Sequence, residues 1–168
     1  MGKFRFGALI AALVTMVAVS AQAADPSLSA AANQKYLADF AKQPGVIKTA
    51  SGLEYKIIQN GFGARPGPYN KVQVSYKGAL INGKVFDSTE PGLPATFTVN
   101  ELIPGWTEAL ELMREGDHWQ LVIPANLAYG TRGAGGGSIP PDQVLVFDLT
   151  LLKVLPPDRE PQGADSGQ

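Results

Sequence analysis

The chain has 168 residues, a formal net charge of −1, no cysteine and a single histidine. Its length suits one ordinary domain, and the 19 glycines and 13 prolines predict many loops. The lack of cysteine excludes disulfides, thiol nucleophiles, cysteine zinc sites and a lipid-modified cysteine, and one histidine excludes a histidine-cluster metal site. The charge balance argues against nucleic-acid binding, which needs concentrated basic surface. We expect a folded domain that uses no metal and no other cofactor.

Residues 1–23 have the layout of a secretory signal peptide. Two basic residues precede an apolar run over residues 8–19, and the small residues Ala21 and Ala23 flank a cleavage site before Ala24. A membrane anchor is the alternative, but this run is shorter than the roughly 20 residues needed to span hydrocarbon. The sequence therefore predicts export to a bacterial periplasm and a mature form without a membrane span.

Residues 24–50 predict a short helical extension before the main domain. Ser27 or Ser29 can cap the helix, and Pro44 with Gly45 ends it. Its apolar stripe consists of Tyr36, Leu37 and Phe40. This stripe is short, so we expect it to pack on its own domain and the protein to be mainly monomeric.

Within residues 51–155, apolar and polar residues alternate in several segments, as they do in half-buried strands. The expected strands cover 53–58, 72–81, 85–86, 96–99, 118–123 and 144–154. In the first, Leu53, Tyr55 and Ile57 should face inward. Asn82-Gly83 predicts a two-residue type I′ hairpin. In the last, one face is wholly apolar and contains Leu145, Phe147, Leu149 and Leu151.

One strong amphipathic helix is expected between these strands. Its apolar side carries Ile103, Trp106, Leu110 and Met113, with Pro104 at its start and Gly116 at its end. The fold class is therefore α+β, a mostly antiparallel β-sheet wrapped on one short helix. Residues 156–168 are polar and predict a disordered tail.

Several features that suggest chemistry have simpler interpretations. The glycine-rich loop at 130–138 lacks the Gly-Lys-Ser/Thr of a phosphate loop, so a mobile loop beside a binding cleft is favoured. His118 lies on the more polar face of its strand, which favours a solvated residue over a catalytic base. Glu108, Glu111 and Glu115 have helical spacing and are expected on the solvated face.

Aromatic residues gather at positions that point inward, and one acidic residue accompanies them. The aromatic residues are Tyr76, Phe97, Trp106, Tyr129 and Phe147. In a plain hairpin Gly78 faces Asp87, which aims an acidic side chain towards this aromatic side. Asp87 is then either a solvated residue at a strand end or a group that accepts a hydrogen bond from the Tyr76 hydroxyl.

From Ser51 to Leu155 the sequence resembles the FKBP-type peptidyl-prolyl cis-trans isomerases, the macrolide-binding immunophilins. Six ordered blocks carry the resemblance: V-Q-V-S-Y-K-G-A-L from 72, G-K-V-F-D-S-T from 83, E-L-I-P-G-W-T-E-A-L from 101, W-Q-L-V-I-P from 119, L-A-Y-G from 127 and I-P-P-D-Q-V-L-V-F-D-L-T-L-L from 139. Each block alone is weakly specific. Six in order with matching gaps are highly specific.

The resemblance implies a pocket and assigns roles to its residues. Asp87, the Ile103 backbone N–H and the Tyr129 hydroxyl would be catalytic, with Asp87 a buried polar group held by Tyr76. Substrate would contact Tyr76, Phe86, Phe97, Leu102, Trp106 as the floor, Ile139 and Phe147. Strict alternation separates Phe86 from Asp87, so a shared pocket requires a bulge or a strand end there. The loop before Ile139 is about one glycine longer than usual.

The implied function is isomerisation of X-Pro bonds in exported, unfolded or partly folded polypeptides, with macrolides as implied inhibitors. The main alternative is a non-catalytic module that grips proline-containing segments, or a holdase chaperone, because the same pocket serves both. A small hydrolase that uses Asp87 or His118 is a third, weaker interpretation.

Overall fold

The computed structural model describes residues 24–157, so the predicted leader and nearly all of the predicted tail lie outside the described residues. The helices and 3-10 turns are η1 Pro26–Leu28, α1 Ala30–Phe40, η2 Val99–Glu101, α2 Pro104–Leu112, η3 Ala125–Leu127, η4 Gly130–Arg132 and η5 Gly135–Gly137. The strands are β1 Val46–Lys48, β2 Glu54–Gln59, β3 Lys71–Leu80, β4 Val85–Ser88, β5 Ala95–Thr98, β6 His118–Ile123 and β7 Leu145–Leu155.

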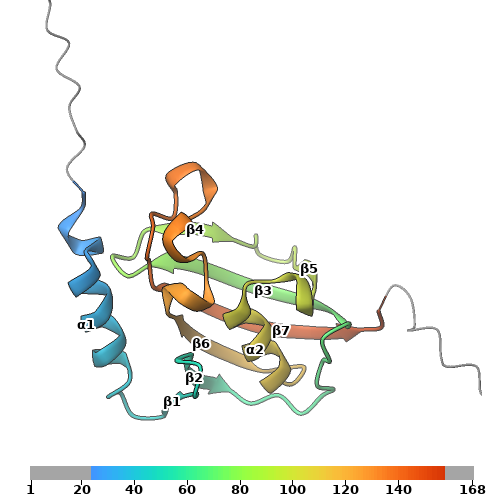
Figure 1. The fold of residues 1–168 in the computed structure, drawn as a ribbon. Coiled ribbons are helices and arrows are strands. Elements are labelled where there is room, and N and C mark those ends of the chain that lie inside the picture. Colours follow the sequence, from blue (N-terminus) through green and yellow to red (C-terminus); the bar gives the residue numbers. More distant parts are fainter. Residues whose placement is uncertain (1–23, 158–168) are drawn as a thin grey trace, which may run out of the picture.

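All strand pairs are antiparallel, in the order β1-β2-β6-β7-β3-β4, and β5 also pairs with β3 (Figure 1). The predicted α+β fold is confirmed. The outer edge of β3 is shared, since β5 pairs with residues 71–74 and β4 with residues 77–79. This division leaves a break in the edge beside Tyr76, where the Thr89 hydroxyl accepts a hydrogen bond from the Tyr76 N–H at 3.0 Å.

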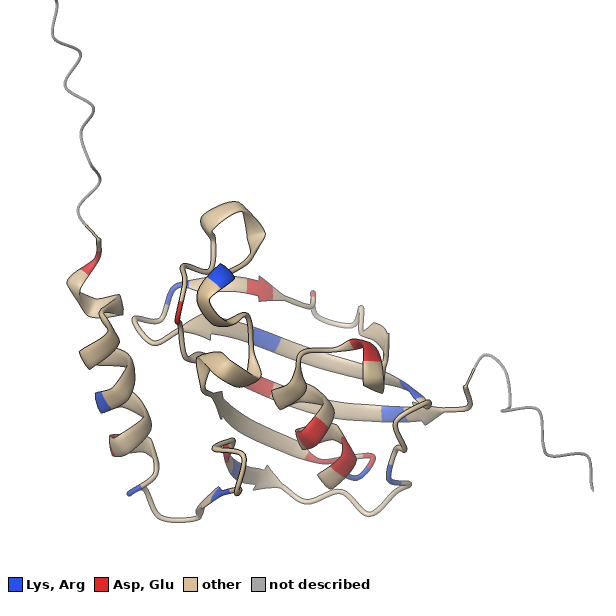
Figure 2. Cartoon of the chain, in the orientation of Figure 1, with Lys and Arg blue, Asp and Glu red and all other residues tan. Residues whose placement is uncertain are grey.

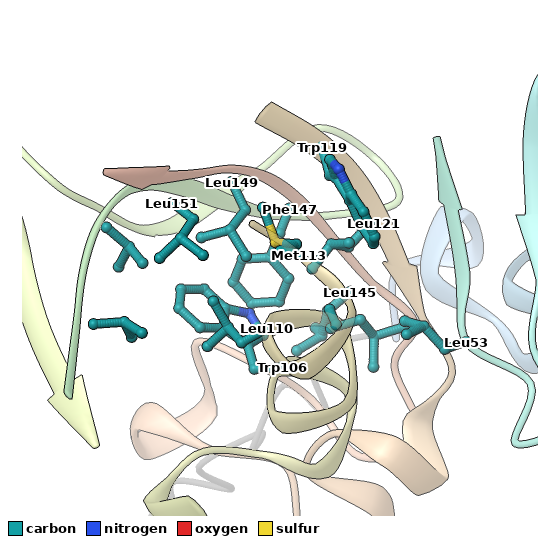
Figure 3. Packing of buried hydrophobic residues seen from close by; sticks show 14 of the residues in the cluster. Leu53, Trp106, Leu110, Met113, Trp119, Leu121, Leu145, Phe147, Leu149 and Leu151 are labelled. Carbon is teal, nitrogen blue, oxygen red and sulfur yellow. The ribbon is translucent and has the colours of Figure 1, made fainter. Parts of the chain in front are cut away.

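The main core lies between α2 and the sheet. The four predicted inward residues of β7 are buried, and α2 buries Trp106, Ala109 and Leu110 against them (Figure 3). Gly105 allows the close approach, because a Cβ there would lie 2.4 Å from the Ile123 side chain. Helix α2 ends at Leu112, before the expected stop at Gly116. It ends early because the Asp117 carboxylate accepts the Arg114 N–H at 2.6 Å in place of a helical carbonyl.

Helix α1 packs on the domain, as its apolar stripe predicts. Ser29 caps it by accepting the Ala32 N–H, and Phe40 is buried against Val122 and Val144. A second anchor is polar. The buried Asn33 side chain donates to Leu28 O, Ser29 O and Gln143 Oε1, and its Oδ1 accepts the Val144 N–H at 2.8 Å.

Two local expectations for the strands are wrong. Glu54 is fully buried instead of facing solvent, because it pairs with Lys48 of β1 and its carboxylate accepts from Lys48 Nζ at 3.0 Å. Ile57 is 36% exposed, because β2 bends away from β6 at a register shift between Ile57 and Gln59.

The predicted type I′ turn at Asn82-Gly83 is also wrong. Only Gly83 has a positive φ, +86°, and the loop has three residues, closed by hydrogen bonds from Leu80 N to Lys84 O and from Gly83 N to Leu80 O. A turn followed by a left-handed glycine is the usual three-residue hairpin. Asn82 instead uses its side-chain amide to donate to Asp25 at 3.2 Å.

Replacing Asn33 with alanine tests the polar anchor between α1 and the domain. The change leaves the buried Val144 N–H without its acceptor, which we expect to cost about 1–3 kcal/mol of unfolding free energy. Urea denaturation followed by circular dichroism measures this loss. The exposed neighbour Gln34→Ala is the control and should change stability by less than about 0.5 kcal/mol. Equal effects of the two changes would show that the anchor does not matter.

Candidate functional site

An aromatic cleft of about 290 Å³ opens beside the N-terminal end of α2. Its lining consists of Tyr76, Phe86, Asp87, Phe97, Glu101, Leu102, Ile103, Trp106, Tyr129 and Phe147. The structure thus brings together nine of the ten residues that the sequence indicated for a site. They come from strands β3, β4, β5 and β7, from helix α2 and the two residues before it, and from the residue before η4.

The floor of the cleft is the indole of Trp106. Three rings meet it edge to face, with centroid distances of 5.1 Å for Tyr76, 5.9 Å for Phe97 and 5.2 Å for Phe147. Edge-to-face packing fixes ring orientation as well as burying area. The Trp106 indole N–H is buried and has no hydrogen-bond acceptor among the described residues. The floor is therefore a rigid and almost wholly apolar surface.

A bulge in β4 brings Phe86 and Asp87 into the same cleft. Ala79 pairs with Val85 and Gly78 with Asp87, so Phe86 is the extra residue on its strand. The bulge also shifts the three-residue hairpin back to the Gly78 and Asp87 pairing that a two-residue hairpin predicts. The bulge therefore breaks the alternation of side chains along β4, which is what a pocket shared by Phe86 and Asp87 requires.

Gly78 is a site determinant that the sequence analysis did not single out. A Cβ at this position would lie 2.6 Å from the Phe147 ring and 2.7 Å from the Phe86 ring. Those two rings pack edge to face at 5.6 Å directly over it. The available signal was a glycine in the interior of a strand, which often marks a close approach.

Asp87 and Tyr76 form the only side-chain hydrogen bond between two lining residues in the described part of the chain. The Tyr76 hydroxyl donates to Asp87 Oδ2 at 2.5 Å. Burial raises the pKa of Tyr76, and the hydrogen bond to the Asp87 carboxylate raises it further. The phenol therefore stays protonated and keeps its donor role.

The expectation that Asp87 is buried is wrong. Its side chain is exposed, because β4 is an edge strand and the carboxylate lies at the rim of the cleft. Water can therefore hydrate the charge while Tyr76 orients it. Glu101 adds a second carboxylate to the lining, and it was missed because nothing in its spacing distinguishes it from a solvated residue.

Two hydrogen-bond donors lie at the mouth of the cleft. Ile103 precedes α2, and its carbonyl accepts from Trp106 N and Thr107 N. Its own N–H has no acceptor within residues 24–157. Tyr129 immediately precedes η4, and it is 40% exposed.

Two residues considered in the sequence lie away from the cleft lining. Ile139 is buried in the main core and closes the base of the glycine loop, pairing with Ala134 through two backbone hydrogen bonds of 2.9 and 3.1 Å. His118 is half-buried on β6, and its Nε2 lies 2.8 Å from Asp148 Oδ1.

Comparison with known proteins identifies the family. Residues 63–152 match the FKBP-type peptidyl-prolyl cis-trans isomerase family, and residues 7–57 match the domain amino terminal to FKBP-type peptidyl-prolyl isomerase. The chain belongs to the FKBP-type isomerase family. The first match alone covers more than half of the chain.

Named relatives agree with this assignment. The FKBP-type 22 kDa peptidyl-prolyl cis-trans isomerase of Escherichia coli is 53% identical over 127 residues, which cover 75% of this chain and 61% of that protein. The outer membrane protein MIP of Legionella longbeachae is 51% identical over 120 residues, 71% of this chain and 51% of that protein. The chain thus spans between half and two thirds of the length of these relatives.

Solved structures confirm the fold. The crystal structure of FkpA from Escherichia coli superposes with a TM-score of 0.71 at 44% identity, covering 75% of this chain and 59% of that one. A peptidyl-prolyl cis-trans isomerase from Pseudomonas syringae superposes with a TM-score of 0.70 at 38% identity, covering 74% of this chain and 92% of that one.

Gly78→Ala tests how the cleft is shaped. The added methyl must displace the Phe147 or Phe86 ring, which we expect to cost about 1–3 kcal/mol of stability. Ligand-binding geometry should be lost with it, because both rings line the cleft. Isomerisation of an X-Pro peptide should fall by about tenfold or more at a temperature where the variant is folded. Lys77→Ala, an exposed neighbour on β3, should retain full activity. Full activity of folded Gly78→Ala would contradict this account of the wall.

Proposed function

We propose that this protein is a peptidyl-prolyl cis-trans isomerase that acts on X-Pro bonds of unfolded or partly folded polypeptides. The observation that carries the proposal is the aromatic cleft, with Trp106 as an edge-packed floor and donors at its mouth. Its chemical character suits a reaction in which an amide rotates and no bond is cut.

Rotation about an X-Pro bond has a barrier of about 18–20 kcal/mol because it breaks amide resonance. In the twisted transition state the carbonyl is less polar than in the planar amide. A cleft that excludes water favours the twisted form, since the planar form loses more hydration on entering. A thousandfold to hundred-thousandfold acceleration requires only about 4–7 kcal/mol.

Individual residues have distinct roles in this proposal. The prolyl ring packs on Trp106 between Phe97 and Phe147, while the Ile103 N–H and the Tyr129 hydroxyl donate to neighbouring substrate carbonyls. Asp87 fixes the Tyr76 ring by accepting a hydrogen bond from its hydroxyl. Macrolide inhibitors would occupy the same cleft.

We further propose export to a bacterial periplasm with cleavage before Ala24, and a mainly monomeric mature form. The N-terminal residues support export, and the packing of Phe40 on Val122 and Val144 supports the monomer because it covers the apolar stripe of α1. No helix within residues 24–157 is long and apolar enough to cross a membrane. Finding Met1 at the N-terminus of the exported protein, or a stable dimer by light scattering at micromolar concentration, would refute these proposals.

The direct test of function is isomerisation of a short X-Pro peptide, which separates the enzyme from a non-catalytic proline-binding module or holdase. We expect acceleration that a macrolide of this inhibitor class abolishes. Binding of the peptide without acceleration would favour the module.

Three substitutions rank the contributions of the cleft. Phe147→Ala removes a buried ring and should cost about 3–5 kcal/mol of stability as well as most activity. Asp87→Leu frees the Tyr76 hydroxyl and should lower the rate about tenfold, and Tyr129→Phe removes one donor and should lower it roughly twofold to tenfold. A folded Asp87→Leu variant with no turnover, beside an active Phe147→Ala, would show that polar catalysis dominates.

The pH profile tests whether a titrating side chain takes part. The raised pKa of Tyr76 keeps its phenol protonated well above neutral pH, so its donor role is constant. We expect a rate that is flat between about pH 6 and 8, and unchanged activity in His118→Ala. A tenfold loss in folded His118→Ala, or a bend near neutral pH, would contradict the mechanism.

A further inference from the structure

A second cleft lies at the other end of α2 from the aromatic cleft. The aromatic cleft is lined by Ile103 and Trp106 at the start of α2, whereas this one is lined by Leu112 at its end. Its volume is about 400 Å³, within the roughly 300–1,000 Å³ range of ligand sites. We name it the Phe62 cleft, after an aromatic residue in its lining that is 92% exposed; Ile57, Arg65, Leu112, Arg114 and Trp119 also line it.

The backbone on either side of Phe62 is fixed so that its side chain projects into solvent. Its side chain is 92% exposed, although the flanking glycines are closely docked. The Gly61 N–H donates to Asp117 Oδ1 at 2.5 Å, and the Gly63 N–H donates to Glu115 O at 3.0 Å. A Cβ on Gly61 would lie 2.4 Å from backbone atoms of this turn. The loop is thus fixed in a form that presents the ring.

The apolar part of the cleft extends beyond Phe62. Ile57 and Leu112 are each 36% exposed, and Trp119 lies behind them, stacked on Tyr55 with ring centroids 4.3 Å apart. A rigid exposed aromatic beside a preformed cavity lowers the entropy cost of binding. Isolated exposed apolar residues need no explanation, but this group shares one cavity.

The charges of the cleft select the occupant. Arg65 and Arg114 line it, and neither has a carboxylate partner among the described residues. The one lining carboxylate, Asp117, is buried and accepts two backbone N–H groups, from Gly61 and Arg114. Figure 2 shows basic and acidic residues interspersed along the chain, with acidic residues on α2 as well, so the basic character is confined to the lining of this cleft. Arg114 Nη1 donates to Gly63 O at 3.4 Å, so this guanidinium is held against the Phe62 loop while its other N–H groups keep no carboxylate partner among the described residues. Two guanidinium groups without carboxylates beside an apolar wall favour a ligand that is both apolar and anionic.

We propose that the Phe62 cleft binds an extended polypeptide segment in which an aliphatic or aromatic side chain is flanked by carboxylates. The apolar side chain enters between Phe62 and Leu112, and the carboxylates pair with Arg65 and Arg114. This binding needs no proline and is independent of the aromatic cleft. A client could therefore be held at one cleft while its X-Pro bond occupies the other.

The test uses a fluorescently labelled, proline-free peptide in which Phe and Leu alternate with Asp and Glu. The matched probe has lysine at every acidic position. In fluorescence anisotropy with the full chain, we expect the acidic peptide to bind at least about tenfold more tightly at low salt, with the difference shrinking as salt rises. The net charge of −1 does not favour an acidic ligand, so such a preference must be local.

Single substitutions test whether the acidic peptide binds at the Phe62 cleft. Phe62→Ser and Arg65→Gln should each lower the affinity for the acidic peptide by about fivefold or more. The rate of isomerisation of a short X-Pro peptide should not change. Leu93→Ser is the matched control, because Leu93 is 65% exposed and outside the cleft lining. Equal affinity for both peptides, no binding of either, or an equal loss in Leu93→Ser would overturn the proposal. Sedimentation velocity that showed a Phe62-dependent dimer would do the same, because a second copy would then be the occupant.

Discussion

The edge-to-face packing around Trp106 is the contact on which both the fold and the site depend. Trp106 belongs to the core that joins α2 to the sheet, and its indole is also the floor of the aromatic cleft. Tyr76, Phe97 and Phe147 each pack against it from a different strand. Because the same rings serve both purposes, the cleft keeps its shape without a ligand, and substitutions there affect stability and binding together.

The edge of β3 shows how an irregular strand produces a concave surface. A continuous partner strand would cover this edge, but β4 and β5 divide it, and between them Thr89 alone bonds the backbone of Tyr76. The bulge at Phe86 and the missing side chain at Gly78 then let two rings close one wall. Backbone irregularities at a strand edge therefore position the side chains that regular alternation would separate.

Much of the fold followed from the sequence because it depends on periodicity. The buried face of β7, the phase of α2 and the stripe ending at Phe40 are all set by alternation or helical spacing. Nine of the ten residues predicted for the site line one cleft, because the aromatic positions point inward and the family blocks are ordered. These features depend on residue types close together in the chain, so they can be predicted from the sequence.

The failures share a dependence on tertiary context. The burial of Glu54 depends on its pairing with Lys48, and the exposure of Asp87 depends on the position of β4 at the edge of the sheet. Neither pairing can be read from the local sequence. The turn before Lys84 was assigned from the dipeptide alone, whereas Leu80 and Lys84 set the loop length. The exposed Phe62 escaped notice because only the docked glycines on either side reveal that its loop is fixed.

The central claim of the proposed mechanism is that a dry aromatic cleft accelerates amide rotation without proton transfer. The solvent deuterium isotope effect on isomerisation of a short X-Pro peptide tests this most directly. Rotation assisted only by desolvation and fixed donors predicts a ratio of rates in H₂O and D₂O of about 1. A ratio of about 2 or more would show that a proton moves in the rate-limiting step and would contradict the account.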